Sequence, residues 1–199
     1  MTPLQKESPT LIVLSGGESR RFGSKDKGLY RYKGVPLVKR VVDSIGPMAG
    51  EIVVQVAQGK ADEYRQVLGK GVLVQEDTSR FNGPLSGLSE ALRPVKSGIV
   101  LLSPCDLPNV PIALFGLLLS RMENHDAAMP LIGDFPEPIT AVYRTEKLKE
   151  SVEIELRASR LKLSGVIGHL DAVFVPDSEL CKYGISVDTL RGMNTPSIA

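Results

Sequence analysis

A glycine-rich turn followed by basic side chains is the part of the sequence whose residue types and spacing suggest chemistry most directly. Gly16 and Gly17 follow an aliphatic run, and because glycine has no Cβ, the backbone of such a turn can approach a ligand closely. Consecutive N–H groups in a turn form a concave donor site for phosphate oxygens. Cationic side chains that could neutralise phosphate follow shortly afterwards: Arg20, Arg21, Lys25 and Lys27. The segment therefore predicts a phosphate-binding loop.

The spacing excludes two common phosphate loops. A Walker loop needs glycine, four residues and then Gly-Lys, but Phe22 stands five residues after Gly17. The dinucleotide fingerprint G-x-G-x-x-G is not found in this segment. The two glycines alone would fit a plain turn before a solvated basic helix. The added spacing of Arg21, Gly23 and Lys27 favours a phosphate site.

A single carboxylate, Asp106, follows another aliphatic run, at 99–102. Ligands of open α/β sheets bind at the carboxyl ends of the strands, where this side chain is expected. A lone carboxylate there could bind Mg²⁺ together with waters and substrate phosphates. It could also cap a following helix, because Pro108 and Pro111 suit a nearby helix start. The neighbouring Cys105 is expected to be a buried, inert thiol.

Composition limits the classes of function. The chain has 199 residues, with 24 Lys+Arg against 23 Asp+Glu and a net charge of +1, which argues against nucleic-acid and membrane binding. Two cysteines provide neither a disulfide framework nor zinc spacing. The first ten residues are polar and contain no apolar core of signal-peptide length, and the longest apolar run, near 112–119, is too short to span a bilayer. We expect a cytoplasmic protein.

Short aliphatic runs alternate with amphipathic segments, a pattern typical of βαβ units. In the first half we predict strands over 11–14, 52–54, 72–74 and 99–102, and helices over 36–45, 61–68 and 84–92. In the second half we predict helices over 112–122 and 146–157 and strands over 127–131, 139–143 and 172–175. Proline before 139–143 suits an edge strand or the start of a strand. The expected fold is one doubly wound α/β domain over residues 1–199.

The ordered motifs resemble a known family. L-[AS]-G-G-x-x-x-R-x-G-x-x-x-K, here from Leu14 to Lys27, is similar to the nucleotide signature of molybdenum cofactor guanylyltransferases. Further segments resemble the family in the same order, over nearly the whole chain: 34–37, 76–77, 83–87, 104–108, 137–143 and 194–196. The resemblance implies a Rossmann-like nucleotidyltransferase fold, with a mostly parallel sheet and helices on both faces.

The resemblance also implies an activity. Family members use Mg²⁺ and transfer GMP from GTP to the phosphate of molybdopterin, releasing pyrophosphate. Lys27 and Arg21 would neutralise the triphosphate, and Asp106 would bind the metal. The remaining nucleotide contacts would come from Leu14, Ser15, Gly16, Gly17, Asp77, Gly83, Pro84 and Leu85. Asp77 could accept hydrogen bonds from guanine or hold ribose hydroxyls, or it could be a surface turn acid.

Residues 1–110 would then bind the nucleotide and 111–199 the acceptor. Acceptor contacts are expected from Glu137, Pro138, Arg160 and Asn194, with Arg157 as a second basic candidate. Arg157 and Arg160 could equally form a solvated helix face. Where relatives carry asparagine after the second strand, this chain has the segment 55–58, Gln-Val-Ala-Gln.

Three alternatives share parts of this pattern. A cytidylyltransferase of the same fold resembles L-A-A-G at the loop, so Gly16-Gly17 favours the guanylyl enzyme. Cobinamide-phosphate guanylyltransferases share the first motif but not the run at 104–108. A non-catalytic regulatory module would not need Lys27 and Asp106. A monomer is the default expectation, and the family likeness suggests transient contacts with molybdenum or tungsten enzymes.

Overall fold

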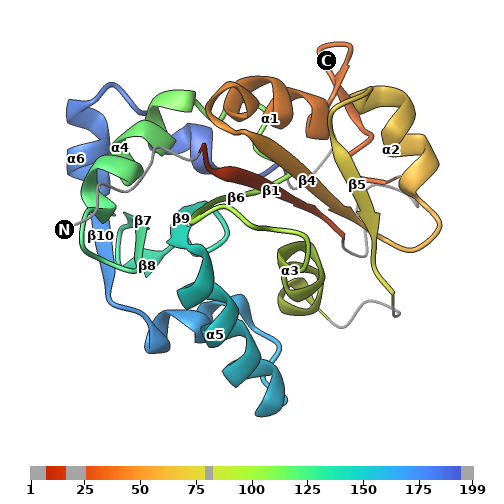
Figure 1. Ribbon diagram of the computed structural model, residues 1–199. Coiled ribbons are helices and arrows are strands. Elements are labelled where there is room, and N and C mark those ends of the chain that lie inside the picture. Colours follow the sequence, from red (N-terminus) through yellow and green to blue (C-terminus); the bar gives the residue numbers. More distant parts are fainter. Residues whose placement is uncertain (1–7, 17–25, 79–82, 194–199) are drawn as a thin grey trace.

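The computed structural model describes residues 8–16, 26–78 and 83–193 and is built around one twisted sheet (Figure 1). The strands follow the order β10-β7-β9-β6-β1-β4-β5, and β8 pairs with β7. Their bounds are β1 Thr10–Ser15, β4 Glu51–Val56, β5 Leu73–Glu76, β6 Ile99–Pro104, β7 Ala127–Ile132, β8 Phe135–Pro136, β9 Ala141–Arg144 and β10 Ala172–Pro176. Strands of the second half thus hydrogen-bond into the same sheet as those of the first.

Most of the sheet is parallel. β1 pairs in parallel with β4 and β6, β4 with β5, and β7 with β10, whereas β9 runs antiparallel between β6 and β7. The edge position considered for this strand is therefore wrong. Pro138 lies before the strand, where its missing N–H removes no ladder hydrogen bond. The other interpretation of this proline, that it marks the start of a strand, is the one that agrees with the structure.

Helices cover both faces of the sheet (Figure 1). One face packs against α1 Leu37–Ile45, α2 Ala61–Leu68, α4 Ile112–Met122 and α6 Asp177–Lys182. The other packs against α3 Pro84–Leu92 and α5 Thr145–Arg157. Because strand side chains alternate, Leu11 and Val13 of β1 enter the first core while Ile12 and Leu14 enter the second. The predicted mostly parallel α/β fold is confirmed.

The longer elements agree with the sequence pattern, and the shorter ones were missed. Helices occupy 61–68, 84–92 and 112–122 as predicted. The helix predicted over 36–45 begins one residue later, at Leu37, because Pro36 ends a strand. The unpredicted elements are the hairpin of β2 Arg31–Tyr32 and β3 Val35–Pro36, β8, α6, and the 3-10 turns η2 Gly46–Met48, η3 Leu163–His169 and η4 Val187–Leu190. Such short pieces contain too few residues to show a period.

Among the described residues, no helix is long and apolar enough to cross a membrane. Cys105 is buried, and burial raises the pKa of its thiol to about 12, which fits the predicted inert thiol.

Candidate active site

The carboxyl ends of the parallel strands bring several predicted residues to one edge of the sheet. Ser15 ends β1 and Gly16 follows it, Asp77 follows β5, and Asp106 follows β6. Because β1 lies between β4 and β6, this edge is continuous from Asp77 to Asp106. The backbone N–H of Cys105 donates to the Leu14 carbonyl, which joins β1 to the Asp106 turn. The arrangement is the ligand position of open α/β sheets.

Lys27 and Asp106 meet at this edge although 79 residues separate them in the chain. The Lys27 ammonium forms an ion pair with Asp106 Oδ2, and the two side chains are 24% and 17% exposed. A cation and a carboxylate that remain partly open to solvent can both contact an incoming phosphate and its counter-ion. Gly17 and Arg21, which the sequence also predicts here, lie outside the described residues.

A buried hydrogen-bond network holds the segment that contains Lys27. The hydroxyls of Ser15 and Tyr64 lie 2.6 Å apart, and the Tyr64 hydroxyl also donates to Asp26 Oδ1. The Gly28 N–H donates to the same oxygen over 2.9 Å. Burial raises the pKa of Tyr64 far above its usual range, so its hydroxyl keeps its proton. The residues on both sides of Lys27 are therefore fixed to β1 and α2.

Tyr64 and Asp26 were not predicted as site residues. The signal for Tyr64 is weak, because a tyrosine on the apolar face of a helix usually serves the core. Gly28 was not predicted as a site residue either, yet it leaves no room for a side chain. A Cβ at this position would overlap Ser15 Oγ and Tyr64 Oη.

Asp77 lies between two glycines at the other end of the same edge. Its side chain is nearly buried, and Gln55 Nε2 of β4 donates to Asp77 Oδ1 over 2.8 Å. A Cβ at Gly16 would lie 3.1 Å from Asp77 Oδ2, and one at Gly87 would lie 3.4 Å from Oδ1. Burial raises the pKa of the Asp77 carboxyl, partly offset by the hydrogen bond from Gln55. This burial does not fit the alternative interpretation of Asp77 as an acid in a surface turn.

The turn at Gly83 begins α3 beside this carboxylate. Gly83 has a φ of 94°, a conformation that favours glycine, and Pro84 occupies the first helical turn. Leu85 is fully buried in the core, so any contact it makes with a ligand must come from its backbone. The nucleotide contacts predicted for these three residues stay predictions.

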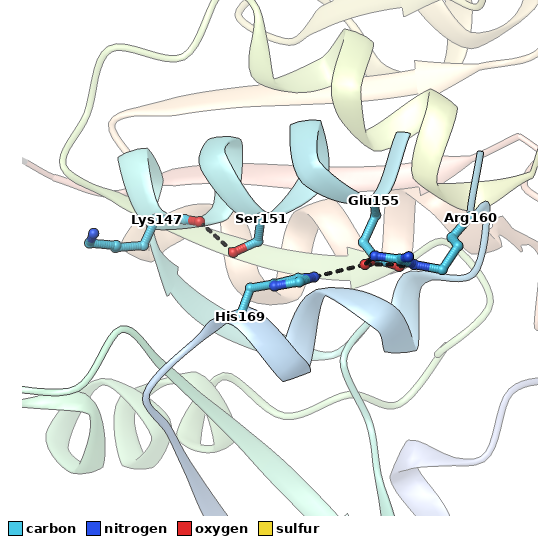
Figure 2. A network of polar contacts seen from close by, with 5 residues as sticks. All are labelled: Lys147, Ser151, Glu155, Arg160 and His169. Atoms are coloured by element: carbon cyan, nitrogen blue, oxygen red, sulfur yellow. Dashed lines mark hydrogen bonds and ion pairs between the residues drawn. The ribbon is translucent and has the colours of Figure 1, made fainter. Parts of the chain in front are cut away.

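A buried carboxylate on α5, that of Glu155, holds together Arg160 and His169 from the segment that follows the helix (Figure 2). Glu155, only 3% exposed, accepts hydrogen bonds from Arg160 Nη2 at 2.6 Å and Arg160 Nε at 3.0 Å, and His169 Nε2 lies 2.8 Å from its Oε1. Between these partners the chain passes Leu161, whose carbonyl oxygen would lie 3.3 Å from a Cβ at Gly83. The network therefore supports one wall of the α3 turn.

Both basic residues considered for the acceptor have a carboxylate partner on α5. Arg160 is paired with Glu155, and Arg157 forms an exposed ion pair with Glu153 one turn away on α5. An acceptor contact for Arg160 stays a prediction. Sequence reasoning missed Glu155, because a glutamate on a charged helix gives no sign that it is buried.

The Glu155 network predicts an acid-sensitive component of stability. Arg160 and His169 lower the pKa of the Glu155 carboxyl from 4.5 to about 2. A depressed carboxyl pKa stabilises the fold fully above the ordinary value, and this contribution is lost as the pH falls from 4.5 towards 2. Glu155→Gln should therefore unfold at lower urea concentration than wild type at neutral pH, and this difference should shrink across that interval.

The control for this titration is Glu153→Gln, which removes only an exposed ion-pair partner on the same helix. Urea unfolding of the three proteins at each pH provides the comparison. A constant difference between wild type and Glu155→Gln down to the lowest pH would contradict the assignment.

A cavity of about 580 Å³ opens beside Asp106. Glu137, which the sequence assigns to the acceptor side, lines this cavity together with Ile139 and Thr140, which lie just before β9. Burial raises the pKa of the Glu137 carboxyl. The Pro138 carbonyl accepts a hydrogen bond from the Tyr143 hydroxyl over 2.6 Å, which fixes the turn. Asn194 lies outside the described residues.

The donor set at Asp106 suits a metal that shares its ligands with a substrate. Within the described residues there is no group of three or more His, Cys, Asp or Glu side chains that could hold an ion by themselves. Mg²⁺ is commonly bound by one or two carboxylates together with waters and substrate phosphates. One carboxylate at the edge of an open cavity fits that mode of binding.

Comparisons with known proteins agree with this geometry. Residues 11–172 match the family described as the MobA-like NTP transferase domain. Molybdenum cofactor guanylyltransferases from Shewanella putrefaciens and Shewanella sediminis are 31% and 32% identical over 154 residues, which cover 76% of this chain and 77% and 76% of the relatives. A crystal structure of molybdopterin-guanine dinucleotide biosynthesis protein A from Archaeoglobus fulgidus has a similar fold, with a TM-score of 0.76 at 23% identity over 94% of this chain and 93% of that one.

Proposed function

Because the chain belongs to the MobA-like NTP transferase family, we propose that it transfers GMP from GTP to the phosphate of molybdopterin and releases pyrophosphate. The observation that supports this most strongly is the pairing of Lys27 with Asp106 at the carboxyl edge of the sheet, beside an open cavity. Residues 1–110 bind the nucleotide in this proposal, and residues 111–199 supply most of the acceptor side.

The reaction needs positioning and charge rather than a protein nucleophile. A phosphate oxygen of the acceptor attacks the α-phosphorus of GTP and forms a new P–O bond. The bond from that phosphorus to the α,β-bridging oxygen breaks, and pyrophosphate leaves with its electron pair. Lys27 stabilises the charge that develops on the phosphate oxygens, since a fixed cation in a partly desolvated site acts strongly on such charge.

Asp106 is the residue that would hold the divalent cation, which we propose is Mg²⁺. When bound, the ion supplies positive charge to the phosphate oxygens. Asp106 also sets the place of the Lys27 ammonium through their ion pair. The Tyr64 and Asp26 hydrogen bonds keep Lys27 at this edge before the nucleotide arrives.

The base of GTP would contact the Asp77 end of the same edge. A carboxylate can accept paired hydrogen bonds from the N1–H and amino groups of guanine, or it can hold ribose hydroxyls. Gln55 orients Asp77 Oδ1, and Oδ2 points towards Gly16, where the nucleotide backbone contacts are predicted. Gln55 Oε1 is buried and has no hydrogen-bond partner among the described residues, so this oxygen is available to accept a hydrogen bond from a ligand.

The proposal predicts stabilisation by one nucleotide. GTP with Mg²⁺ should raise the melting temperature, whereas CTP, ATP and UTP at the same concentration should raise it much less. A ligand that binds only the native state at about 100 times its Kd adds about 2.7 kcal/mol of stability. Asp77→Asn should reduce the GTP shift, because asparagine has one acceptor oxygen and would place an NH2 donor against one of the two guanine N–H groups.

The control for this experiment is Asp62→Asn, an exposed aspartate on α2. Its GTP shift should equal that of wild type. A shift with CTP in place of GTP would assign the chain to a cytidylyltransferase activity and overturn the guanylyl proposal. A monomeric state, a cytoplasmic location and transient contacts with molybdenum or tungsten enzymes stay predictions.

A further inference from the structure

The cavity beside Asp106 has a wall that sequence reasoning did not predict. The last described turn of the chain, η4 with the residues after it, folds over the carboxyl end of β6. Its contributions to the lining are Val187, Leu190, Arg191 and Gly192. These residues face Asp106, Ile132 and Glu137 from the rest of the sheet edge. The cavity is thus formed by three stretches of the chain, 104–107, 132–140 and 187–192.

The new wall is fixed directly to Asp106. The Met193 N–H donates to the Asp106 carbonyl over 3.0 Å, and a Cβ at Gly192 would lie 2.6 Å from Asp106 Oδ2. Gly192 therefore lets the backbone lie against the carboxylate, with no space for a side chain between them. Arg191, the preceding residue, is consequently held next to the group that pairs with Lys27.

The carboxylates that line the cavity favour a role for a cation in binding an anionic ligand. Asp106 and Glu137 both line the cavity, and any carboxylate charge that Lys27 does not offset would repel an entering anion. Lys27 is bound to Asp106 and is assigned to the triphosphate. Arg191 is the cation among the described residues that line the cavity.

The partner that Arg191 has in the structure is a weak one. Arg191 Nη1 lies 3.3 Å from Asp188 Oδ1 one turn earlier, and both side chains are 77% exposed. Exposed ion pairs of this kind contribute little stability, so the guanidinium can leave Asp188 at small cost. A phosphate offers a better partner, because guanidinium forms paired charge-assisted hydrogen bonds with it.

We propose that Arg191 binds the phosphate of the acceptor and places its attacking oxygen beside the Lys27–Asp106 pair. This inference rests on the proposed function, because it identifies how the same site holds its second substrate. The bond changes are those given above, and Arg191 contributes no proton to them. The apolar side chains of Ile132, Ile139 and Leu190 on the same cavity would contact the ring system that bears this phosphate.

The test is steady-state GMP transfer with molybdopterin by wild type and Arg191→Ala. The KM for the acceptor should rise about 10- to 100-fold, because loss of a hydrogen bond between charged groups weakens binding by about that factor. The KM for GTP should stay within about twofold by the same reasoning. Arg191→Lys keeps the charge without the planar fork and should fall between the two.

Arg65→Ala is the matched control, because Arg65 also forms an exposed i,i+3 ion pair with an aspartate, on α2. Its kinetics should equal those of wild type. A phosphate-free pterin used as a competitive inhibitor should keep its inhibition constant in Arg191→Ala, which separates phosphate binding from general damage to the cavity.

Three outcomes would overturn different claims. If wild type transfers GMP and Arg191→Ala keeps the wild-type KM for the acceptor, the role of Arg191 is wrong and the proposed function stands. If Arg191→Ala weakens the phosphate-free pterin as much as molybdopterin, Arg191 shapes the cavity and does not bind phosphate. If wild type transfers no GMP to molybdopterin, the proposed function fails, and the inference fails with it.

Discussion

Asp106→Asn is expected to lower the turnover of GMP transfer about 100- to 1,000-fold, the usual effect of removing one preorganised electrostatic group. Asparagine has nearly the same shape but no charge. It would lose the ion pair with Lys27 and the carboxylate proposed for Mg²⁺. Affinity for GTP measured without metal should change much less, because the Asp77 end of the site is intact. Turnover and GTP affinity are measured on the same protein samples.

Asp43→Asn provides the control for this variant. Asp43 pairs with Lys39 on the exposed side of α1, so its loss removes a carboxylate–lysine pair away from the sheet edge. It should retain wild-type turnover. Full activity of Asp106→Asn would show that the carboxylate is not part of the catalytic apparatus.

Gly28→Ala has the second largest expected effect, because the added methyl group overlaps two hydroxyl groups of the network beside Lys27. The Ser15 and Tyr64 oxygens would have to separate or the backbone of Gly28 would have to shift. Overpacking of this kind typically destabilises a protein by about 1–3 kcal/mol. Because Lys27 is the adjacent residue, turnover should also fall. Urea unfolding and GMP transfer measure the two effects.

Gly116→Ala is the matched control for a glycine that gains a methyl group. Gly116 lies inside α4 with open space around its missing Cβ. Alanine there should leave activity unchanged and could stabilise the helix by about 0.5–1 kcal/mol. Equal stability of Gly28→Ala and wild type would contradict the close packing at Gly28.

The sequence predicts the parts of the fold that depend on local pattern. The aliphatic run around Leu11 and the amphipathic face of α1 identify a strand and a helix without tertiary information. The two-residue strands β2 and β3 cannot be predicted in this way, because their pairing across a tight turn determines them more than side-chain pattern does. Lys33 and Gly34 in this turn have positive φ.

The site divides in the same way. Residues at strand ends, such as Asp77 and Asp106, can be predicted because parallel strands bring their carboxyl ends to one edge. Residues whose role comes from a distant contact cannot. Glu155 looks like any helix-surface glutamate, and Arg191 looks like one residue of a polar C-terminal segment. Only the folded chain shows that one is buried and the other lines the cavity of Asp106.

The most direct test of the proposed reaction follows the two ends of the triphosphate. Wild-type protein is incubated with Mg²⁺, molybdopterin and GTP labelled either at the α-phosphate or at the γ-phosphate. Transfer of GMP predicts that the α-label appears in a guanine dinucleotide and the γ-label in pyrophosphate, in equal amounts. Without a labelled dinucleotide, recovery of the γ-label as inorganic phosphate would show hydrolysis, and recovery of the γ-label on molybdopterin would show phosphoryl transfer. Either result would contradict the proposal.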